Sequence, residues 1–209
     1  MLADIDSYHR YYDHLKGIED YVRSASDLTK QLLAFARGGK YQVNPMNLNE
    51  LTRKSSEMFG RTKKEITIHS KSQEGLWTVE ADSGQIEQVL LNLYVNAWHA
   101  MPDGGDIYIN TKNVTHRDIK SELYEPRPGK YVRITVADNG IGIDMEYKDR
   151  VFVIFQRLHT RRHYDGTGMG LSYCKKIVEG LGGRIWLKSA EGEGATFYFT
   201  IPERSTEDE

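Results

Sequence analysis

The stretch QIEQVLLNLYVNAWHAM, residues 85–101, has the pattern of one amphipathic helix with two distinct faces. One face is apolar and recurs at spacings of three and four residues: Ile86, Val89, Leu90, Leu93, Ala97 and Ala100. The other face carries Gln88, Asn92, Asn96 and His99. Asparagine is a poorer helix former than Glu or Lys, so this face is either ordinary polar surface or lies against something polar. Asparagine carbonyl oxygens are ligands of the kind that Mg²⁺ accepts.

The 209-residue chain has the composition of a globular protein, with 39% hydrophobic and 28% charged residues. A formal net charge of −2 gives no reason to expect a nucleic-acid partner. We find no apolar run long enough to span a membrane and no signal-peptide pattern at the start of the sequence. The single cysteine, Cys174, excludes an internal disulfide and fits a reducing, cytoplasmic location. Because it lies in an apolar-periodic segment, we expect Cys174 to be buried and unreactive.

An N-terminal helix is predicted over residues 14–37, where seven positions form a heptad seam with one polar member: Leu15, Ile18, Val22, Ala25, Thr29, Leu32 and Ala36. A lone helix cannot bury such a seam. We therefore expect a partner helix from residues 1–13 or from a second chain, with packing against the following domain as the alternative. The chain is divided accordingly into a helical segment (1–40), a main domain (41–203) and an acidic tail (204–209) that is predicted to be disordered.

The main domain alternates helices with pairs of strands. Helices are predicted over 48–60, from 83 to the end of the quoted stretch, and over 169–181, with Asn47 and either Asp82 or Ser83 as N-caps and Glu50 at the third helical position. Strands are predicted over 66–70, 76–80, 107–114, 131–137, 184–189 and 195–201. Residues 44–47 are predicted to form a turn, and 116–130 a polar connection. This order predicts an α/β fold, a two-layer α/β sandwich with helices on one face of a mixed or antiparallel sheet.

Two glycine-containing segments follow the central helix. Gly166-Thr-Gly-Met-Gly170 opens a helix and can present backbone N–H groups to an anion, although glycine spacing alone is a weak signal. The segment matches neither a Rossmann turn nor a P-loop. Asp138, which follows an apolar strand and precedes Gly140 and Gly142, could accept from the exocyclic amine of adenine. The alternative is an aspartate that caps its own turn.

A basic segment lies between the two glycine segments. It contains Arg157, Arg161 and Arg162 together with His159 and His163. A loop of this composition fits a lid over phosphates, and its alternative is a solvated surface loop. Metal binding by the two histidines is disfavoured because no carboxylate or cysteine stands at a useful spacing.

Four segments occur in a fixed order: Asn92-Leu-Tyr-Val-Asn96-Ala, Asp138-Asn-Gly-Ile-Gly142, Phe152 to Phe155, and Gly166-Thr-Gly-Met-Gly-Leu171. They resemble the N, G1, F and G2 boxes of bacterial sensor histidine kinases, whose ATP site is shared with DNA gyrase, Hsp90 and MutL. FQRLHTRRHYDGTGMGL (155–171) resembles the phytochrome-type branch of that family. LTKQLLAFARGGKY (28–41) resembles the second helix of the family's dimerisation hairpin. The similarity covers residues 45–202.

The resemblance implies a role for each matching position. Asn96 would bind Mg²⁺, with Asn92 as a second ligand or phosphate contact, and His99 would face the phosphates. Asp138 would take the adenine amine, and Gly140 and Gly142 would shape the pocket. The second glycine segment would contact the phosphates of ATP through Gly166, Thr167, Gly168, Met169, Gly170 and Leu171. Thr196 would help hold a water network beside the adenine, and Arg161 and Arg162 of the lid would assist catalysis.

The family reaction transfers the γ-phosphoryl group of ATP to a histidine and then to an aspartate of a response regulator receiver domain. The resemblance also implies a homodimer formed through the N-terminal helices. In the hydrolytic relatives a glutamate occupies the position of Asn92 and orients water. An amide cannot act as a base, so phosphoryl transfer to a side chain is favoured over hydrolysis. An ATPase of the same superfamily is one alternative, and a non-enzymatic module in which ATP only orders the lid is another.

The acceptor histidine of the family is followed by an acid, whereas Arg10 follows His9 and Leu15 follows His14. We therefore expect that the sequence begins inside or after the first hairpin helix, without the acceptor. We also expect that this chain binds Mg-ATP but does not phosphorylate itself.

Overall fold

The structure, a computed structural model, describes residues 42–121, 124–154 and 168–204, together with Tyr12, Leu15, Ile18 and Val22. The chain divides into two compact units, Met1–Lys40 and Tyr41–Glu209. In the first unit the four described residues are helical, and the side chains of Ile18 and Val22 are 57% and 64% exposed. The rest of the predicted heptad seam and the tail from 205 onward lie outside the described residues. No helix in the described part of the chain is long and apolar enough to cross a membrane.

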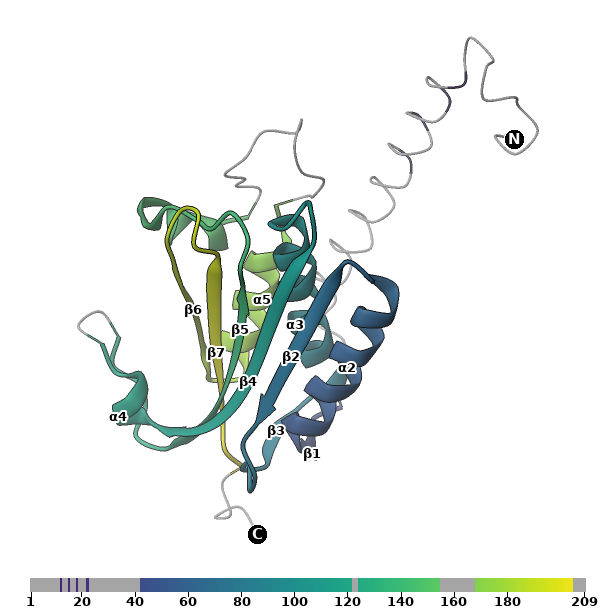
Figure 1. Ribbon diagram of the computed structural model, residues 1–209. Helices are drawn as coiled ribbons and strands as arrows, with labels where there is room; N and C mark the ends of the chain where they lie inside the picture. The colour runs from purple at the N-terminus through teal and green to yellow at the C-terminus, as the bar shows by residue number, and fades with distance from the viewer. Residues whose placement is uncertain are drawn as a thin grey trace. The chain divides into compact units, whose positions relative to one another are not determined.

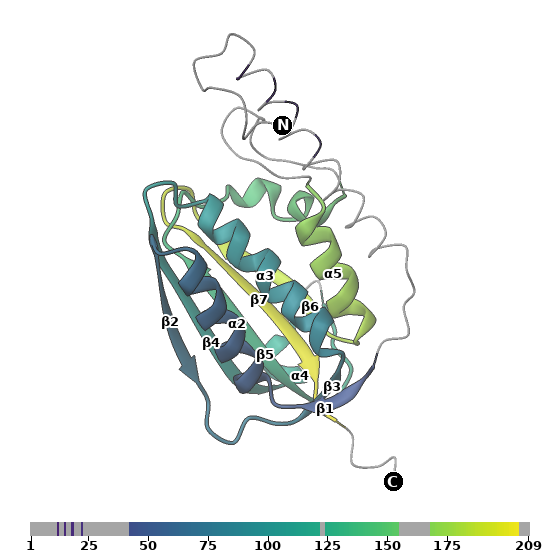
Figure 2. The same cartoon turned by 90° about the vertical axis from the view of Figure 1, so that its right-hand side faces the viewer.

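The second unit is built on a five-stranded mixed sheet in the order β2-β4-β5-β7-β6. Its strands are β2 (Ile66–Ser72), β4 (Gly105–Thr115), β5 (Lys130–Asp138), β6 (Arg184–Ser189) and β7 (Ala195–Pro202). The β2–β4 pair is parallel, and the other three pairs are antiparallel. Helices α2 (Leu48–Thr62), α3 (Ser83–His99) and α5 (Gly170–Gly180) cover one face of the sheet (Figures 1 and 2). This architecture confirms the predicted two-layer α/β sandwich.

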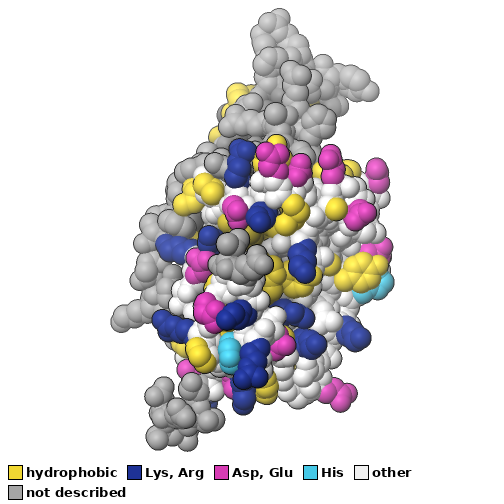
Figure 3. Space-filling view, turned by 90° about the vertical axis from the view of Figure 1, so that its left-hand side faces the viewer, with side chains coloured by type: hydrophobic (Ala, Val, Ile, Leu, Met, Phe, Trp, Pro, Cys, Tyr) yellow, Lys and Arg dark blue, Asp and Glu magenta, His cyan; other side chains and the backbone are white. Residues whose placement is uncertain are grey.

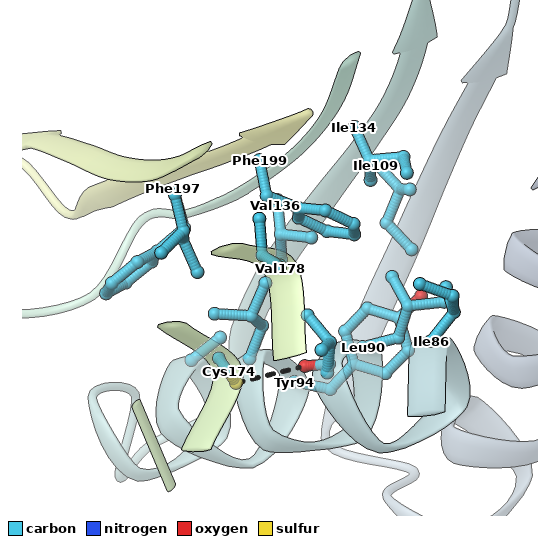
Figure 4. Close-up of a cluster of buried hydrophobic side chains, with 14 of the residues drawn as sticks. Ile86, Leu90, Tyr94, Ile109, Ile134, Val136, Cys174, Val178, Phe197 and Phe199 are labelled. Atoms are coloured by element: carbon cyan, nitrogen blue, oxygen red, sulfur yellow. Dashed lines mark hydrogen bonds between the residues drawn. The ribbon is translucent and has the colours of Figure 1, made fainter. Parts of the chain in front are cut away.

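The apolar face of α3 lies at the centre of the core. Ile86, Val89 and Leu90 are fully buried, and Figure 4 shows α3 side chains facing inward-pointing residues of the sheet, among them Ile134 and Phe199. Burial of each large aliphatic side chain contributes about 1.5–3 kcal/mol relative to exposure, so this stripe is a major source of stability. The helix that carries the predicted polar face is therefore fixed by its opposite face.

Two polar groups on or beside α3 are accommodated within this core. The Tyr94 hydroxyl lies 3.3 Å from the Ser55 hydroxyl of α2, and burial raises the pKa of Tyr94 to about 12. The Cys174 thiol of α5 donates to the Val89 carbonyl at 3.7 Å (dashed line in Figure 4), and burial raises its pKa to about 12. Cys174 is thus buried and remains a protonated thiol at neutral pH, as its apolar surroundings in the sequence predicted.

Side-chain caps fix where the first two helices of this unit begin. The Asn47 carbonyl oxygen accepts from the Asn49 N–H, and the Asp82 carboxylate accepts from the Gln85 N–H, which settles the choice between Asp82 and Ser83. Glu50, at the third position of α2, pairs with Lys54 one turn later at 2.7 Å. The sequence therefore identified Asn47 as an N-cap and gave Asp82 as one of two candidates for the other.

Two predicted connections contain regular structure. Asn44–Met46 forms strand β1, which pairs antiparallel with β3 (Val79–Ala81) in a separate two-stranded sheet. The expectation of a turn here was wrong, because a two-stranded edge tolerates a proline that cannot donate a ladder hydrogen bond. The polar connection 116–130 contains the short helix α4 (His116–Ile119), where the Thr115 N–H and hydroxyl both bond to the Asp118 carboxylate.

The end of α5 and the turn that follows it provide two glycines for testing the packing, Gly180 in the helix and Gly183 in the turn. A Cβ added to Gly183 would collide with the backbone carbonyl of Thr200, whereas nothing lies within 4 Å of a Cβ added to Gly180. We expect Gly183→Ala to lower the free energy of unfolding by at least about 1–3 kcal/mol, the cost of overpacking. Gly180→Ala should leave stability unchanged or slightly raised. Urea unfolding followed by circular dichroism measures both, and equal effects would contradict the packing described.

Candidate functional site

The polar face of α3 meets the beginning of α5. Asn92 accepts from the Gln88 side-chain amide at 3.3 Å and donates to the Gly170 carbonyl at 3.4 Å. The second of these bonds joins residues 78 positions apart and holds the Asn92 amide beside the first residue of α5. The structure therefore brings the asparagine face of the central helix together with the second glycine segment.

Asn96, one turn further along α3, has a buried side-chain nitrogen with no acceptor. Its Nδ2 atom is one of two buried side-chain polar atoms without a hydrogen-bond partner in the described part of the chain. A half-turn about the last side-chain bond of an asparagine exchanges its amide oxygen and nitrogen. In Asn96 this rotation breaks no hydrogen bond made by the nitrogen. An oxygen-seeking cation such as Mg²⁺ would satisfy this position, so the residues present fit the metal that the resemblance implies.

The last turn of α3 is surrounded by aromatic and charged groups. The rings of Trp98 and His99 lie 4.7 Å apart, and the Lys63 ammonium lies 3.2 Å from the centre of the Trp98 ring. The Trp98 indole N–H donates to Glu65 at 2.8 Å. Trp98 is thus held on two sides and contacts His99, and Lys63 is a cation near this end of the helix that the sequence did not single out.

Asp138, the last residue of β5, carries the buried carboxylate of the site and is only 8% exposed. Its Oδ1 accepts from the backbone N–H of Gly140 at 3.0 Å and of Ala195 at 3.3 Å. Burial raises the pKa of Asp138, and the two backbone hydrogen bonds partly oppose that rise. Both bonds fall on Oδ1, which leaves Oδ2 available to a ligand donor.

Close backbone packing holds the loop after Asp138 in place. A Cβ on Gly140 would lie 2.6 Å from the Ala100 carbonyl oxygen, and the neighbouring Ile141 N–H donates to that same carbonyl at 3.1 Å. Gly194, with φ +78°, passes so close to the Asp138 carbonyl that a Cβ would collide with it. The first glycine segment is therefore packed between the end of α3 and the β6–β7 turn.

The beginning of α5 has the properties of an anion site. Gly168 adopts φ +71°, and Met169 occupies the N-cap position with no side-chain hydrogen bond to the helix. The first-turn N–H groups of α5 therefore lack the cap that a Ser or Asp would supply, and they carry the positive end of the helix dipole. Leu171 packs against the core immediately after this turn.

Other predicted site residues fall outside this arrangement or outside the described residues. Residues 155–167 are not described, which includes Arg157, Arg161, Arg162, Gly166 and Thr167. Thr196 pairs with Ala137 and occupies the strand face opposite to the Asp138 carboxylate, because neighbouring residues of a strand alternate between faces. Ala195, one residue earlier, is buried and donates to Asp138 instead.

Two positioning contacts were missed in the sequence. The Ser189 hydroxyl accepts from the Ile143 N–H at 2.8 Å and donates to the Gly194 carbonyl at 2.6 Å, which ties the first glycine segment to the β6–β7 turn. Asn139 bonds to the backbone and side chain of Asp106 on β4. Neither contact leaves a sequence signal, since single serine and asparagine residues are common in turns.

Comparison with known proteins agrees with this geometry. A sequence profile of the family described as "Histidine kinase-, DNA gyrase B-, and HSP90-like ATPase" matches residues 81–205. Cyanobacterial phytochrome A of Nostoc sp. strain PCC 7120 is 42% identical over 190 residues, which cover 90% of this chain. The same alignment covers 22% of the phytochrome, so this chain spans less than a quarter of that relative.

Solved structures show the same fold. The catalytic domain of histidine kinase ThkA is 33% identical and superposes with a TM-score of 0.62, covering 78% of this chain and 96% of that domain. The structure of ThkA in complex with the response regulator protein TrrA is 26% identical, with a TM-score of 0.69, and covers 96% of this chain and 53% of that chain.

The raised pKa of Asp138 generates a pH-dependent prediction. The folded protein holds the Asp138 proton more tightly than the unfolded chain does. Protonated Asp138 therefore contributes its full stabilisation of the fold below its ordinary pKa, and this contribution is lost as pH rises through the folded-state pKa. Asp138→Asn removes that titration. We expect the unfolding free energy of wild type minus that of the variant to decrease as pH rises above about 4. Urea unfolding across acidic to neutral pH tests this, and a constant or increasing difference would contradict it.

Proposed function

Because this chain belongs to the family of histidine kinase-, DNA gyrase B- and HSP90-like ATPases, we propose that it binds Mg-ATP and donates the γ-phosphoryl group to a histidine side chain in two-component signalling. The observation that carries this proposal is the contact of Asn92 with the first residue of α5. That contact sets the Asn92 amide beside an uncapped helix N-terminus, and Asn96 follows one turn later on the same helix. Oxygen ligands for a cation and N–H donors for an anion in one place are what a metal-bound polyphosphate requires.

Adenine recognition is assigned to Asp138. The Oδ2 atom is left over from the backbone bonds made by Oδ1 and can accept from the exocyclic amine of adenine. Guanine carries a carbonyl at the equivalent ring position, and a carbonyl has no hydrogen to donate to the Asp138 carboxylate. The low exposure of Asp138 strengthens this discrimination because water cannot easily replace the missing partner.

Magnesium and phosphate binding are assigned to α3 and α5. Asn96 would hold Mg²⁺ through its carbonyl oxygen, with Asn92 as a second ligand or phosphate contact and His99 facing the phosphates. The bound metal would neutralise charge on the phosphates during transfer. The backbone of 166–171 would hold the phosphates, and Arg161 and Arg162 of the lid would close over them. On the adenine side, the backbone of Ala195 takes the place that the sequence suggested for Thr196.

Transfer to a side chain is favoured over hydrolysis by the chemistry of Asn92. A general base must accept a proton, and the amide of Asn92 cannot do so. In addition, its oxygen and nitrogen are already bonded to Gln88 and Gly170. An ATPase of the same superfamily therefore remains the second candidate, and a non-enzymatic module that only binds ATP is the third.

The partners follow from the same proposal. ThkA, at 26% identity, has been crystallised with a response regulator, and we propose that a receiver domain is the final acceptor for this protein as well. Dimerisation is assigned to the helical segment 1–40, where the described Ile18 and Val22 are exposed apolar residues at heptad spacing.

The metal assignment is tested by calorimetric titration with a non-hydrolysable ATP analogue, with and without Mg²⁺. We expect Asn96→Ala to weaken binding about 10- to 100-fold in Mg²⁺, the scale seen even for outer-shell partners of a metal. Without Mg²⁺ the variant should bind like the wild type. Asn110→Ala, an asparagine on the opposite face of the sheet, is the matched control and should bind normally. Equal Mg²⁺ dependence of binding in all three proteins would contradict the assignment of Asn96 as a magnesium ligand.

The phosphoryl acceptor is tested with γ-labelled ATP. The chain alone should acquire no acid-labile, base-stable label, because neither His9 nor His14 is followed by an acid. A separately purified hairpin domain that carries the acceptor histidine should become labelled when the chain is added. Steady-state phosphate release without such labelling would favour the ATPase, and ATP binding with neither activity would favour the non-enzymatic module.

A further inference from the structure

The sheet face that carries no long helix presents a regular array of outward side chains. Strand register places Lys112 of β4 opposite Arg133 of β5, and Arg133 opposite Thr200 of β7. Thr200 in turn is paired with Arg184 of β6. Residues that face each other on neighbouring strands project to the same side of the sheet, so all four side chains lie on one face. Three cations therefore occupy one line across four adjacent strands.

The charges at the outward strand positions of this face are strongly biased. Outward positions of the five strands carry five Lys or Arg residues, which we call the cationic face: Lys71, Lys112, Arg133, Arg184 and Lys188. Asp106 is the acid at an outward strand position in the described chain, and His69 and Asn139 already bind it at 2.7 and 3.2 Å. Figure 3, which looks onto this face, shows Lys and Arg side chains spread across it with Asp and Glu side chains among them, so the bias applies to the outward strand positions and not to the face as a whole.

One further carboxylate lies near the line of cations. Asp118 in α4 interacts electrostatically with Lys112 and Arg133, which helps to lower its pKa. Its Oδ2 is held by two hydrogen bonds from Thr115, which are the larger causes of that lowering. Asp118 therefore offsets part of the local positive charge but is committed to capping its own helix.

The arginines of the cationic face are held by aromatic rings. The Arg184 guanidinium lies 4.2 Å from the centre of the Tyr124 ring and 5.2 Å from that of Trp186. Trp186 stacks on Tyr198 at 5.3 Å with 11° between the rings, and Arg133 lies 5.8 Å from Tyr198. A guanidinium over a ring keeps its in-plane N–H groups free to bind carboxylates in pairs. The rings thus fix the arginines without using their donors, although one N–H group of Arg184 already donates to the Ser121 hydroxyl at 3.4 Å.

Two features of this arrangement are unfavourable. Like charges directly opposite each other on neighbouring strands are destabilising, and Lys112 and Arg133 are such a pair. The Arg133 Nε atom is also buried with no hydrogen-bond partner among the described residues, although buried donors are normally satisfied. A carboxylate bound beside Lys112 and Arg133 would relieve the repulsion between these two cations.

We propose that the cationic face is a docking surface for an acidic segment of a partner protein, with Arg133, Arg184 and Lys112 binding its carboxylates. Single-stranded nucleic acid is the other polyanion to consider, but its bases bind by stacking on free aromatic faces. Here the faces of Trp186 and Tyr198 are occupied by each other and by arginines, and Tyr108 stacks on His69 at 4.8 Å. The geometry therefore favours carboxylates over bases.

The test is fluorescence anisotropy with labelled octaglutamate, octaglutamine and oligothymidylate as probes for the full chain. Octaglutamate should bind more tightly than either other probe. Lys112→Gln/Arg133→Gln should weaken octaglutamate binding at least about tenfold, since charge-assisted hydrogen bonds are lost. Arg61→Gln/Lys64→Gln, which removes the same charge at the end of α2, should have little effect. Circular dichroism melting verifies that both variants fold.

The binding position is measured independently by ¹⁵N NMR, because the chain also carries basic residues at 157, 161 and 162. Octaglutamate should shift the amide signals of β4, β5, β6 and β7 around Lys112, Arg133 and Arg184. Shifts centred on the start of α5 would overturn the proposal, as would equal losses in the two double variants. Tighter binding of oligothymidylate than of octaglutamate would replace it with a nucleic-acid surface.

Discussion

The structure depends on the burial of one face of α3. Ile86, Val89 and Leu90 anchor this helix between the sheet and its neighbouring helices, with no solvent exposure. Because a helix is rigid, fixing the apolar side also fixes the direction of the polar side. Asn92 and Asn96 therefore reach their positions without any loop having to order them. If Asn92 and Asn96 hold Mg²⁺ as proposed, the metal end of the proposed nucleotide site is preorganised, which lowers the entropy lost on binding.

The end of the site that we assign to adenine is held by backbone packing. Gly140 lies against the carbonyl of Ala100, and Gly194 lies against that of Asp138, so the Asp138 carboxylate is enclosed by chain with little side-chain bulk. The enclosure explains both the low exposure of Asp138 and the direction of its pKa shift. It also means that the two ends of the site are joined directly, because the residue after Gly140 bonds to the C-terminal end of α3.

Much of this arrangement could be read from the sequence, and the failures have identifiable causes. The period of the apolar residues predicted α3 because it depends on local pattern, whereas the roles of Asn92, Asn96 and Asp138 came from the family resemblance and stay predictions. The resemblance suggested a role for Thr196 beside the adenine, but Thr196 pairs with Ala137 and lies on the strand face opposite to Asp138, which the sequence alone does not reveal. β1 was missed because Asn44-Pro45 has turn composition, and only the distant partner β3 makes it a strand. The line formed by Lys112, Arg133 and Arg184 was invisible for the same reason.

The parallel pairing of β2 with β4 has a consequence for how the chain folds. Two parallel neighbours cannot be joined by a tight turn, and the segment that connects these strands contains β3 and α3. β2 can pair with β4 only after that segment has crossed from one strand to the other, so the loop-closure entropy of this pair is lost before its contacts form. The antiparallel pairs β4–β5, β5–β7 and β6–β7 do not require the crossover. The helix that carries Asn92 and Asn96 thus also belongs to the connection that places β2 at the edge of the sheet.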